Sequence, residues 1–252
     1  LHLLFLGHLG LLVDLALPLL LAGHELTVHF LDPALVLVGL VFGPGLWVRR
    51  VLDRYSEPAD RYPGTGAELA RHLLDKHGAT SVKVEQTDQG DHYDPTAKVV
   101  RLSENVLRGS TPAAVAVAAH ECGHALQDQQ GYQPMRWRAS VVPAANIGSQ
   151  LGMPMIFLGI AFGWSGLAMV GILAFSLAVL FHLVTLPVEF DASHRAIRIL
   201  EQSGIASSDE MVGVRKTLYA AGFTYVASTL IAVVQLLYFL WQAGLLGGSS
   251  ED

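Results

Sequence analysis

The sequence has little charge and almost no cysteine. Asp, Glu, Lys and Arg make up 15% of its 252 residues, against about 25% in an average soluble domain. Hydrophobic residues reach 52% and the mean hydropathy is +0.42, which favours a protein embedded in a lipid bilayer. The single cysteine, Cys122, excludes an internal disulfide framework, so nothing requires an oxidising compartment. A net charge of −6 without a basic stripe argues against nucleic acid as a partner.

Three apolar runs are candidates for transmembrane helices, which need about 20 apolar residues each. The first, 31–48, ends at two arginines, and the last is 225–246. As one helix, the run 151–188 would be about 57 Å long, nearly twice the hydrocarbon thickness. We therefore expect a break at the GWSG tetrapeptide, 163–166, and predict a helical hairpin over 144–188.

The apolar segment 1–30 is harder to interpret. Asp14 and Pro18 weaken a transmembrane helix there, and the basic start that is typical of a signal peptide is lacking. The sequence therefore leaves open whether this segment spans the membrane.

Between the apolar runs lies a polar block, 49–138, that holds 12 of the 16 Lys and Arg residues. If 144–188 is a hairpin, this block and the polar segment 189–222 lie on the same side of the membrane. Six arginines near the ends of spans place that side in the cytoplasm by the positive-inside rule: Arg49, Arg50, Arg136, Arg138, Arg195 and Arg198.

The polar block has the pattern of a small α+β unit. A helix is predicted over 66–78 and strands over 81–87 and 97–103. A further helix, 111–130, begins with Ser110 or Thr111 as N-cap and Pro112 in its first turn, and it stops at Gly131. The predicted fold is thus a mainly α membrane protein with a small zincin-like catalytic portion, 49–140.

The predicted helix 111–130 contains the motif H-E-x-x-H as His120-Glu121-Cys122-Gly123-His124. Residues four apart lie on one face of a helix, so both imidazoles can bind one metal ion. Glu121 projects beside them and can act as a general base. A helix rich in small apolar residues would bury these polar groups at a cost unless they had a partner, which favours a metal site over a chance match.

A catalytic zinc usually has three protein ligands, so the motif is incomplete by itself. The metzincin pattern is excluded, because Gln127 and Gln130 stand where that pattern needs Gly and His. Glu189, directly after the hairpin, is the preferred third ligand, since two spans return it to the side of His124. We also expect Pro187 to begin a new helix there. Asp191, His194 and Asp128 are the alternatives.

Other residues carry weaker expectations. His92 or Tyr93 could stabilise an oxyanion, although a polar turn between strands is the favoured interpretation of 91–94. The strand 97–103 could pair with an extended substrate. Cys122 is expected to be a small buried residue rather than a ligand. A second metal site is not favoured at the irregularly spaced histidines His2, His8, His24 and His29.

Three segments in matching order resemble the YugP-type neutral zinc metallopeptidases, a family of bacterial membrane proteins: 116–149, 175–196 and 91–106. The resemblance covers about residues 33–245. It implies Zn²⁺ at His120, His124 and Glu189, with Glu121 as general base. Ser193 stands where the broader gluzincin pattern has an Asp that supports a ligand histidine, so Asp191 is assigned that supporting role.

The sequence therefore predicts a multi-pass zinc metallopeptidase of the bacterial inner membrane. Its substrate would be a peptide or protein at the cytoplasmic face. The alternative is a non-proteolytic zinc-binding scaffold or assembly factor, which the intact Glu121 argues against, because a structural site needs no general base. The sequence carries no prediction of oligomeric state or cleavage specificity.

Overall fold

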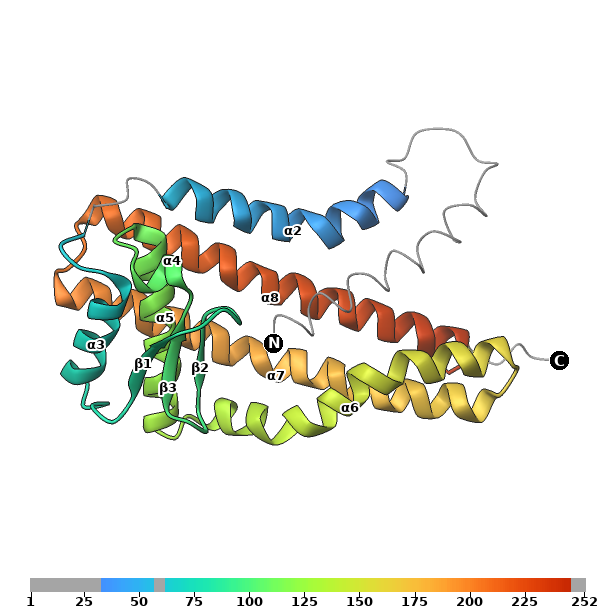
Figure 1. The fold of residues 1–252 in the computed structure, drawn as a ribbon. Helices are drawn as coiled ribbons and strands as arrows, with labels where there is room; N and C mark the ends of the chain where they lie inside the picture. The colour runs from blue at the N-terminus through green and yellow to red at the C-terminus, as the bar shows by residue number, and fades with distance from the viewer. Residues whose placement is uncertain (1–32, 57–61, 246–252) are drawn as a thin grey trace.

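The computed structural model describes residues 33–56 and 62–245, so the predictions for 1–30 lie outside the described residues. The described chain is mostly helical and carries one small sheet (Figure 1). Its elements are α2 (Pro33–Tyr55), α3 (Gly66–Lys76), β1 (Lys83–Gln86), β2 (His92–Asp94), β3 (Val99–Leu102), α4 (Glu104–Leu107), α5 (Pro112–Gln129), α6 (Gln133–Ala161), α7 (Ser165–Ser203) and α8 (Ser208–Gln242).

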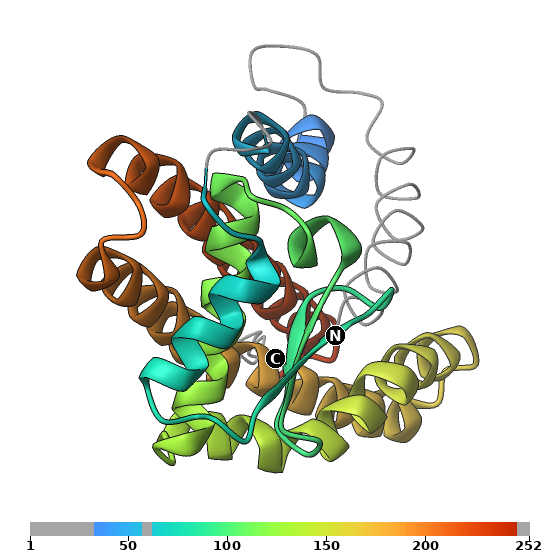
Figure 2. The same cartoon turned by 60° about the vertical axis from the view of Figure 1, so that its left-hand side comes forward.

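Three of these helices, α6, α7 and α8, are long and apolar enough to cross a membrane. They run side by side over much of the length of the molecule, whereas α3, α5 and the sheet gather at one end (Figures 1 and 2). A short turn joins the first two of these helices at the expected break, since α6 ends at Ala161 and α7 begins at Ser165. Gly163 between them has φ +67°, a left-handed conformation that glycine adopts without strain.

The hairpin helices are longer than the apolar runs that predicted them. α6 begins at Gln133, inside the predicted catalytic portion, and α7 continues to Ser203. The expectation that Pro187 begins a new helix is wrong, because Pro187 lies inside α7. α7 packs against α5, α6 and α8, and this tertiary packing outweighs the backbone hydrogen bond that proline removes. Glu189 is therefore carried by a continuous helix of 39 residues.

The small sheet has the order β1-β3-β2, with β1 parallel and β2 antiparallel to β3. The strands predicted at 81–87 and 97–103 are confirmed as β1 and β3, whereas 91–94 contains the short strand β2 rather than only a turn. Both edges of β3 are already paired, so the expectation that this strand receives a substrate strand is wrong. The edge strands of this three-stranded sheet are β1 and β2.

Helix α5 begins as its sequence predicts. The Thr111 hydroxyl accepts a hydrogen bond from the Ala114 N–H at 3.1 Å, and Pro112 occupies the first turn. Small side chains along α5 let the sheet and α3 approach closely, and the core there includes Val100 and Leu102 of β3 with Ala116 and Ala119 of α5. This packing fixes α5, and with it the H-E-x-x-H residues, between the sheet and α7.

Candidate metal centre

The two histidines of the motif lie on the same face of α5. Their ring centroids are 4.7 Å apart and the rings are nearly perpendicular. The His124 side chain is 8% exposed and that of His120 is 13% exposed. Most of the surrounding helix is buried, so these imidazoles are held in place by packing as well as by their polar contacts.

Helix α7 brings Glu189 to both histidines. Its Oε2 lies 3.2 Å from Nε2 of His120 and 3.5 Å from Nε2 of His124. One ligand atom from each of these three residues can be chosen so that all lie within 4.8 Å of one another. The three residues predicted as metal ligands thus lie together in the fold. They come from two helices, and His124 and Glu189 are 65 residues apart in the sequence.

A glycine inside the motif makes this convergence possible. A Cβ atom at Gly123 would lie 2.7 Å from the carbonyl oxygen of Ala192 and 3.2 Å from its Cα. Because both contacts are with backbone atoms, a side chain there would force α5 and α7 apart. Gly123 therefore sets the distance at which Glu189 meets the two histidines.

The other ring nitrogens of the histidines have partners of their own. Nδ1 of His120 lies 3.1 Å from the Ser193 hydroxyl, and Nδ1 of His124 lies 2.9 Å from Oε1 of Gln127. The Gln127 amide nitrogen donates to the Val188 carbonyl and to Asp191, both at 2.8 Å, which leaves its oxygen as the acceptor. The neutral His124 ring therefore donates from Nδ1 and keeps the lone pair of Nε2 free for a metal ion shared with Glu189.

These contacts revise the expected role of Asp191. It does not contact a histidine directly but holds Gln127, which in turn holds His124. Ser193 makes the direct contact with His120, although it stands where the gluzincin pattern has an Asp. The role of Gln127 is indicated in the sequence only by its place on the motif face, one turn after Gly123.

Arg138 on α6 was also missed as a site residue. Its Nη1 donates to Oε1 of Glu189 at 3.1 Å, so each carboxylate oxygen has a partner. Glu189 is only 2% exposed, and a buried carboxylate without a counter-charge would be strongly destabilising. In the sequence, Arg138 is recognisable only as a positive charge near the end of a span.

Glu121 is buried beside this group. The pKa of Glu121 is raised to about 7, chiefly because burial removes its solvation. The carboxylates of Glu189 and Asp91 add to the rise, and His120 and Arg138 oppose it. Glu121 is thus close enough to His120 and Glu189 to interact with both electrostatically. A carboxyl group whose pKa is near neutral can both accept and release a proton close to pH 7.

The alternative ligands lie elsewhere. Asp128 accepts a hydrogen bond from the Tyr93 hydroxyl at 2.6 Å and pairs with Lys98, and His194 is bonded to the Phe190 carbonyl on the outside of α7. The Tyr93 hydroxyl is thus engaged by Asp128, and the oxyanion role of His92 or Tyr93 stays a prediction. The Cys122 side chain is buried, with Sγ 3.6 Å from the Ala70 carbonyl, and behaves as the expected small core residue.

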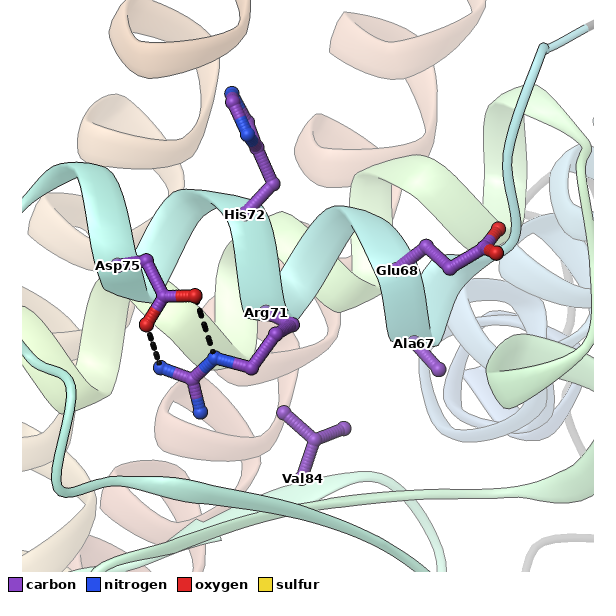
Figure 3. A pocket seen from close by; sticks show the side chains of 6 residues that line it. All are labelled: Ala67, Glu68, Arg71, His72, Asp75 and Val84. Carbon is purple, nitrogen blue, oxygen red and sulfur yellow. Dashed lines mark hydrogen bonds and ion pairs between the residues drawn. The ribbon is translucent and has the colours of Figure 1, made fainter.

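A surface hollow of about 530 Å³ lies between α3 and β1 and contains none of these residues (Figure 3). Its charged side chains are already satisfied locally. Arg71 bonds both carboxylate oxygens of Asp75 and the Val82 carbonyl, and Glu68 closes the capping box with Thr65. The charged side chains that line this hollow therefore do not indicate a binding site.

Two imidazoles and one carboxylate are the ligand set of many catalytic zinc sites, so the donors in this structure fit zinc. Fold and site together define a helical protein with membrane-length helices and a buried His-His-Glu group that could hold a metal ion.

Comparison with known proteins agrees with that class. Residues 31–244 match the family described as "Putative neutral zinc metallopeptidase", and the chain belongs to this family. It is 42% identical over 214 residues to "Putative membrane protease YugP" of Bacillus subtilis (strain 168), an alignment that covers 84% of this chain and 95% of the relative. No solved structure matches the chain.

Proposed function

We propose that this protein is a membrane-embedded zinc metallopeptidase that hydrolyses peptide bonds at the cytoplasmic face of the membrane. The observation that carries the proposal is the approach of Nε2 of both His120 and His124 to one oxygen of Glu189, with Glu121 buried next to them. Membership of a zinc metallopeptidase family supports the same reaction.

In this mechanism His120, His124 and Glu189 would hold a zinc ion. The chemistry that such an ion would supply is activation of a water molecule and polarisation of the scissile carbonyl. The Glu121 carboxylate takes a proton from the attacking water as the new C–O bond forms. Glu121 then releases that proton to the departing amine nitrogen as the C–N bond breaks. Gln127 and Ser193 keep the imidazoles oriented, and Arg138 supplies a positive charge that holds the Glu189 carboxylate in place.

The proposed location follows from the helices and the charges. α6, α7 and α8 are candidate spans, and the relative from Bacillus subtilis is named a membrane protease. The six arginines near span ends favour the cytoplasm for the end of the molecule that carries α5. We therefore propose a multi-pass protein of the bacterial inner membrane with its site open to cytoplasmic peptides.

The decisive experiment compares the wild type with Glu121→Gln, both purified with zinc, on casein and on a peptide library with and without a chelator. We expect the variant to retain its zinc and lose hydrolysis by a factor of about 100 or more, because it lacks the proton acceptor. Unchanged hydrolysis by the variant would overturn the assignment of Glu121. A wild type that binds zinc but cleaves nothing would favour a non-proteolytic zinc scaffold instead.

A further inference from the structure

The exposed side of α7 changes character at one level. Going along the helix, its exposed side chains are apolar through Leu177, Leu180, Leu183 and Phe190. The next exposed residues on this side are charged or polar and begin with His194. Apolar side chains are compatible with lipid tails, and charged or polar side chains need water. The boundary of the hydrocarbon layer therefore falls close to Phe190.

Helices α8 and α2 change character at the same level. On α8 the exposed side chains pass from Lys216 through Tyr219 to Phe223, and on α2 they pass from Trp47 to Arg49. Contacts tie these positions together. The rings of Trp47 and Phe223 meet edge-on at 5.4 Å, and a Cβ at Gly222 would lie 3.4 Å from the ring of Phe190.

Helix α6 repeats the pattern. Arg136 and Trp137 are exposed at its start, and exposed apolar residues such as Ile147 and Leu151 follow. Trp47, Trp137 and Tyr219 thus form an aromatic belt at this end, and Trp164 and Trp241 are exposed at the far end of the bundle. Two such belts are typical of the two interfaces of a membrane protein.

The metal group, formed by His120, His124 and Glu189, lies at the level of the first belt. Glu189 precedes Phe190, and its partner Arg138 follows Trp137. Trp164 in the far belt is about 25 residues from Glu189 along α7, or about 38 Å of helix, and about 35 Å after an average tilt of 20°. The hydrocarbon layer is about 30 Å thick and the whole bilayer about 40–45 Å. Glu189 therefore lies at the edge of the hydrocarbon, next to the headgroup layer.

From this depth we propose that the substrates are polypeptides tethered to the same membrane, cut within about six residues of the point where a transmembrane segment ends. An extended chain advances about 3.3 Å per residue, so only the first few residues after a span lie at the depth of the site. A tether also raises the local concentration of that segment far above that of a free peptide. This inference rests on the proposed peptidase function.

The depth itself can be measured without activity. Spin labels on Leu183→Cys and Arg198→Cys, in protein reconstituted into phosphatidylcholine and phosphatidylglycerol vesicles, report contact with oxygen in lipid or with an aqueous nickel complex. The native Cys122 is buried and remains unlabelled. We expect oxygen contact at position 183 and nickel contact at 198. If both labels reported water or both reported lipid, the boundary would not lie at Glu189 and the proposal would fail.

The substrate class is tested with a single-span model protein that carries a long unstructured tail on the side of the site. Two versions exchange the halves of the tail, and the tail without a span serves as the matched free peptide. All are incubated with vesicles of the zinc-loaded protein and of Glu121→Gln, and the cleavage sites are mapped by mass spectrometry.

We expect both tethered versions to be cut close to the span, whichever half is adjacent, and at least ~10-fold faster than the free tail. A cut that follows the sequence into the distal half, or equal rates for tethered and free tails, overturns the tethered-substrate inference while leaving the peptidase intact. If neither tethered nor free tail is cut, the proposed peptidase function fails and this inference fails with it.

Discussion

At the scale of single residues, the metal group depends on side chains that are not among its three candidate ligands. Gln127 is fully buried and uses its amide nitrogen on Val188 and Asp191, so its oxygen is committed to His124. Partners of this kind fix which ring nitrogen carries the proton and commonly change metal affinity 10–100-fold when they are lost.

We therefore expect Gln127→Leu, which keeps the volume and removes the acceptor, to weaken zinc binding by about 10–100-fold. The measurement is a competition titration with a chelator of known zinc affinity. Gln129→Leu is the matched control, because this glutamine lies on the exposed side of the same helix and donates to the Gly78 carbonyl. Equal zinc affinity for the two variants would show that His124 needs no support from Gln127.

At the scale of elements, the site is a contact between α5 and α7 whose separation is set by Gly123. In a helix an exposed Gly→Ala change normally stabilises by about 0.5–1 kcal/mol. At Gly123 the added methyl would meet the backbone of Ala192 at 2.7 Å, so the opposite sign is expected.

Gly123→Ala should lower the thermal unfolding midpoint and reduce bound zinc, because α7 must move away and take Glu189 with it. Elemental analysis of the purified protein measures the zinc, and circular dichroism follows unfolding. Gly166→Ala is the control, since nothing lies within 4 Å of its added Cβ, and it should keep full zinc and an equal or higher midpoint. A Gly123→Ala protein with full zinc and unchanged stability would mean that the two helices can adjust.

Much of this arrangement could be read from the sequence because it depends on local rules. The cap at Thr111, the break near Gly163 and the return of Glu189 to His124 follow from side-chain chemistry and from the length of a membrane span. The continuous helix through Pro187 could not be predicted, because packing on three neighbours decides it. Strand β2 and the contacts of Gln127 and Arg138 arise only when distant segments meet, and no local pattern encodes them.

At the scale of the whole molecule, zinc at this site would join the small α+β portion to the membrane-length helices, because its ligands come from α5 and α7. A ligand that binds only the folded state stabilises it by about 4 kcal/mol when present at about 1,000 times its dissociation constant. We expect a chelator to lower the unfolding midpoint of the wild type. Glu189→Ala should unfold at the same temperature with or without the chelator, and a chelator effect of equal size in both would place the stabilising metal elsewhere.

The orientation of the molecule can be tested through its lack of reactive cysteine. Burial raises the pKa of the Cys122 thiol well above its ordinary value and covers the sulfur, so the wild type should resist a membrane-impermeant maleimide. Gly166→Cys places a thiol at the tip of the hairpin, and Lys216→Cys places one at the end that carries the metal group; both positions are exposed.

In right-side-out cells or spheroplasts we expect the reagent to label Gly166→Cys directly, and Lys216→Cys only after the membrane is permeabilised. The reason is that the arginines near span ends oppose transfer of their end across the membrane, while the hairpin tip GWSG carries no charge. Inverted vesicles should give the reverse pattern. This control distinguishes a thiol that the reagent cannot reach from one that reacts slowly with the maleimide. Labelling of Lys216→Cys in intact spheroplasts would place the metal group outside the cytoplasm, and the substrate tails would then have to be offered from the outer face.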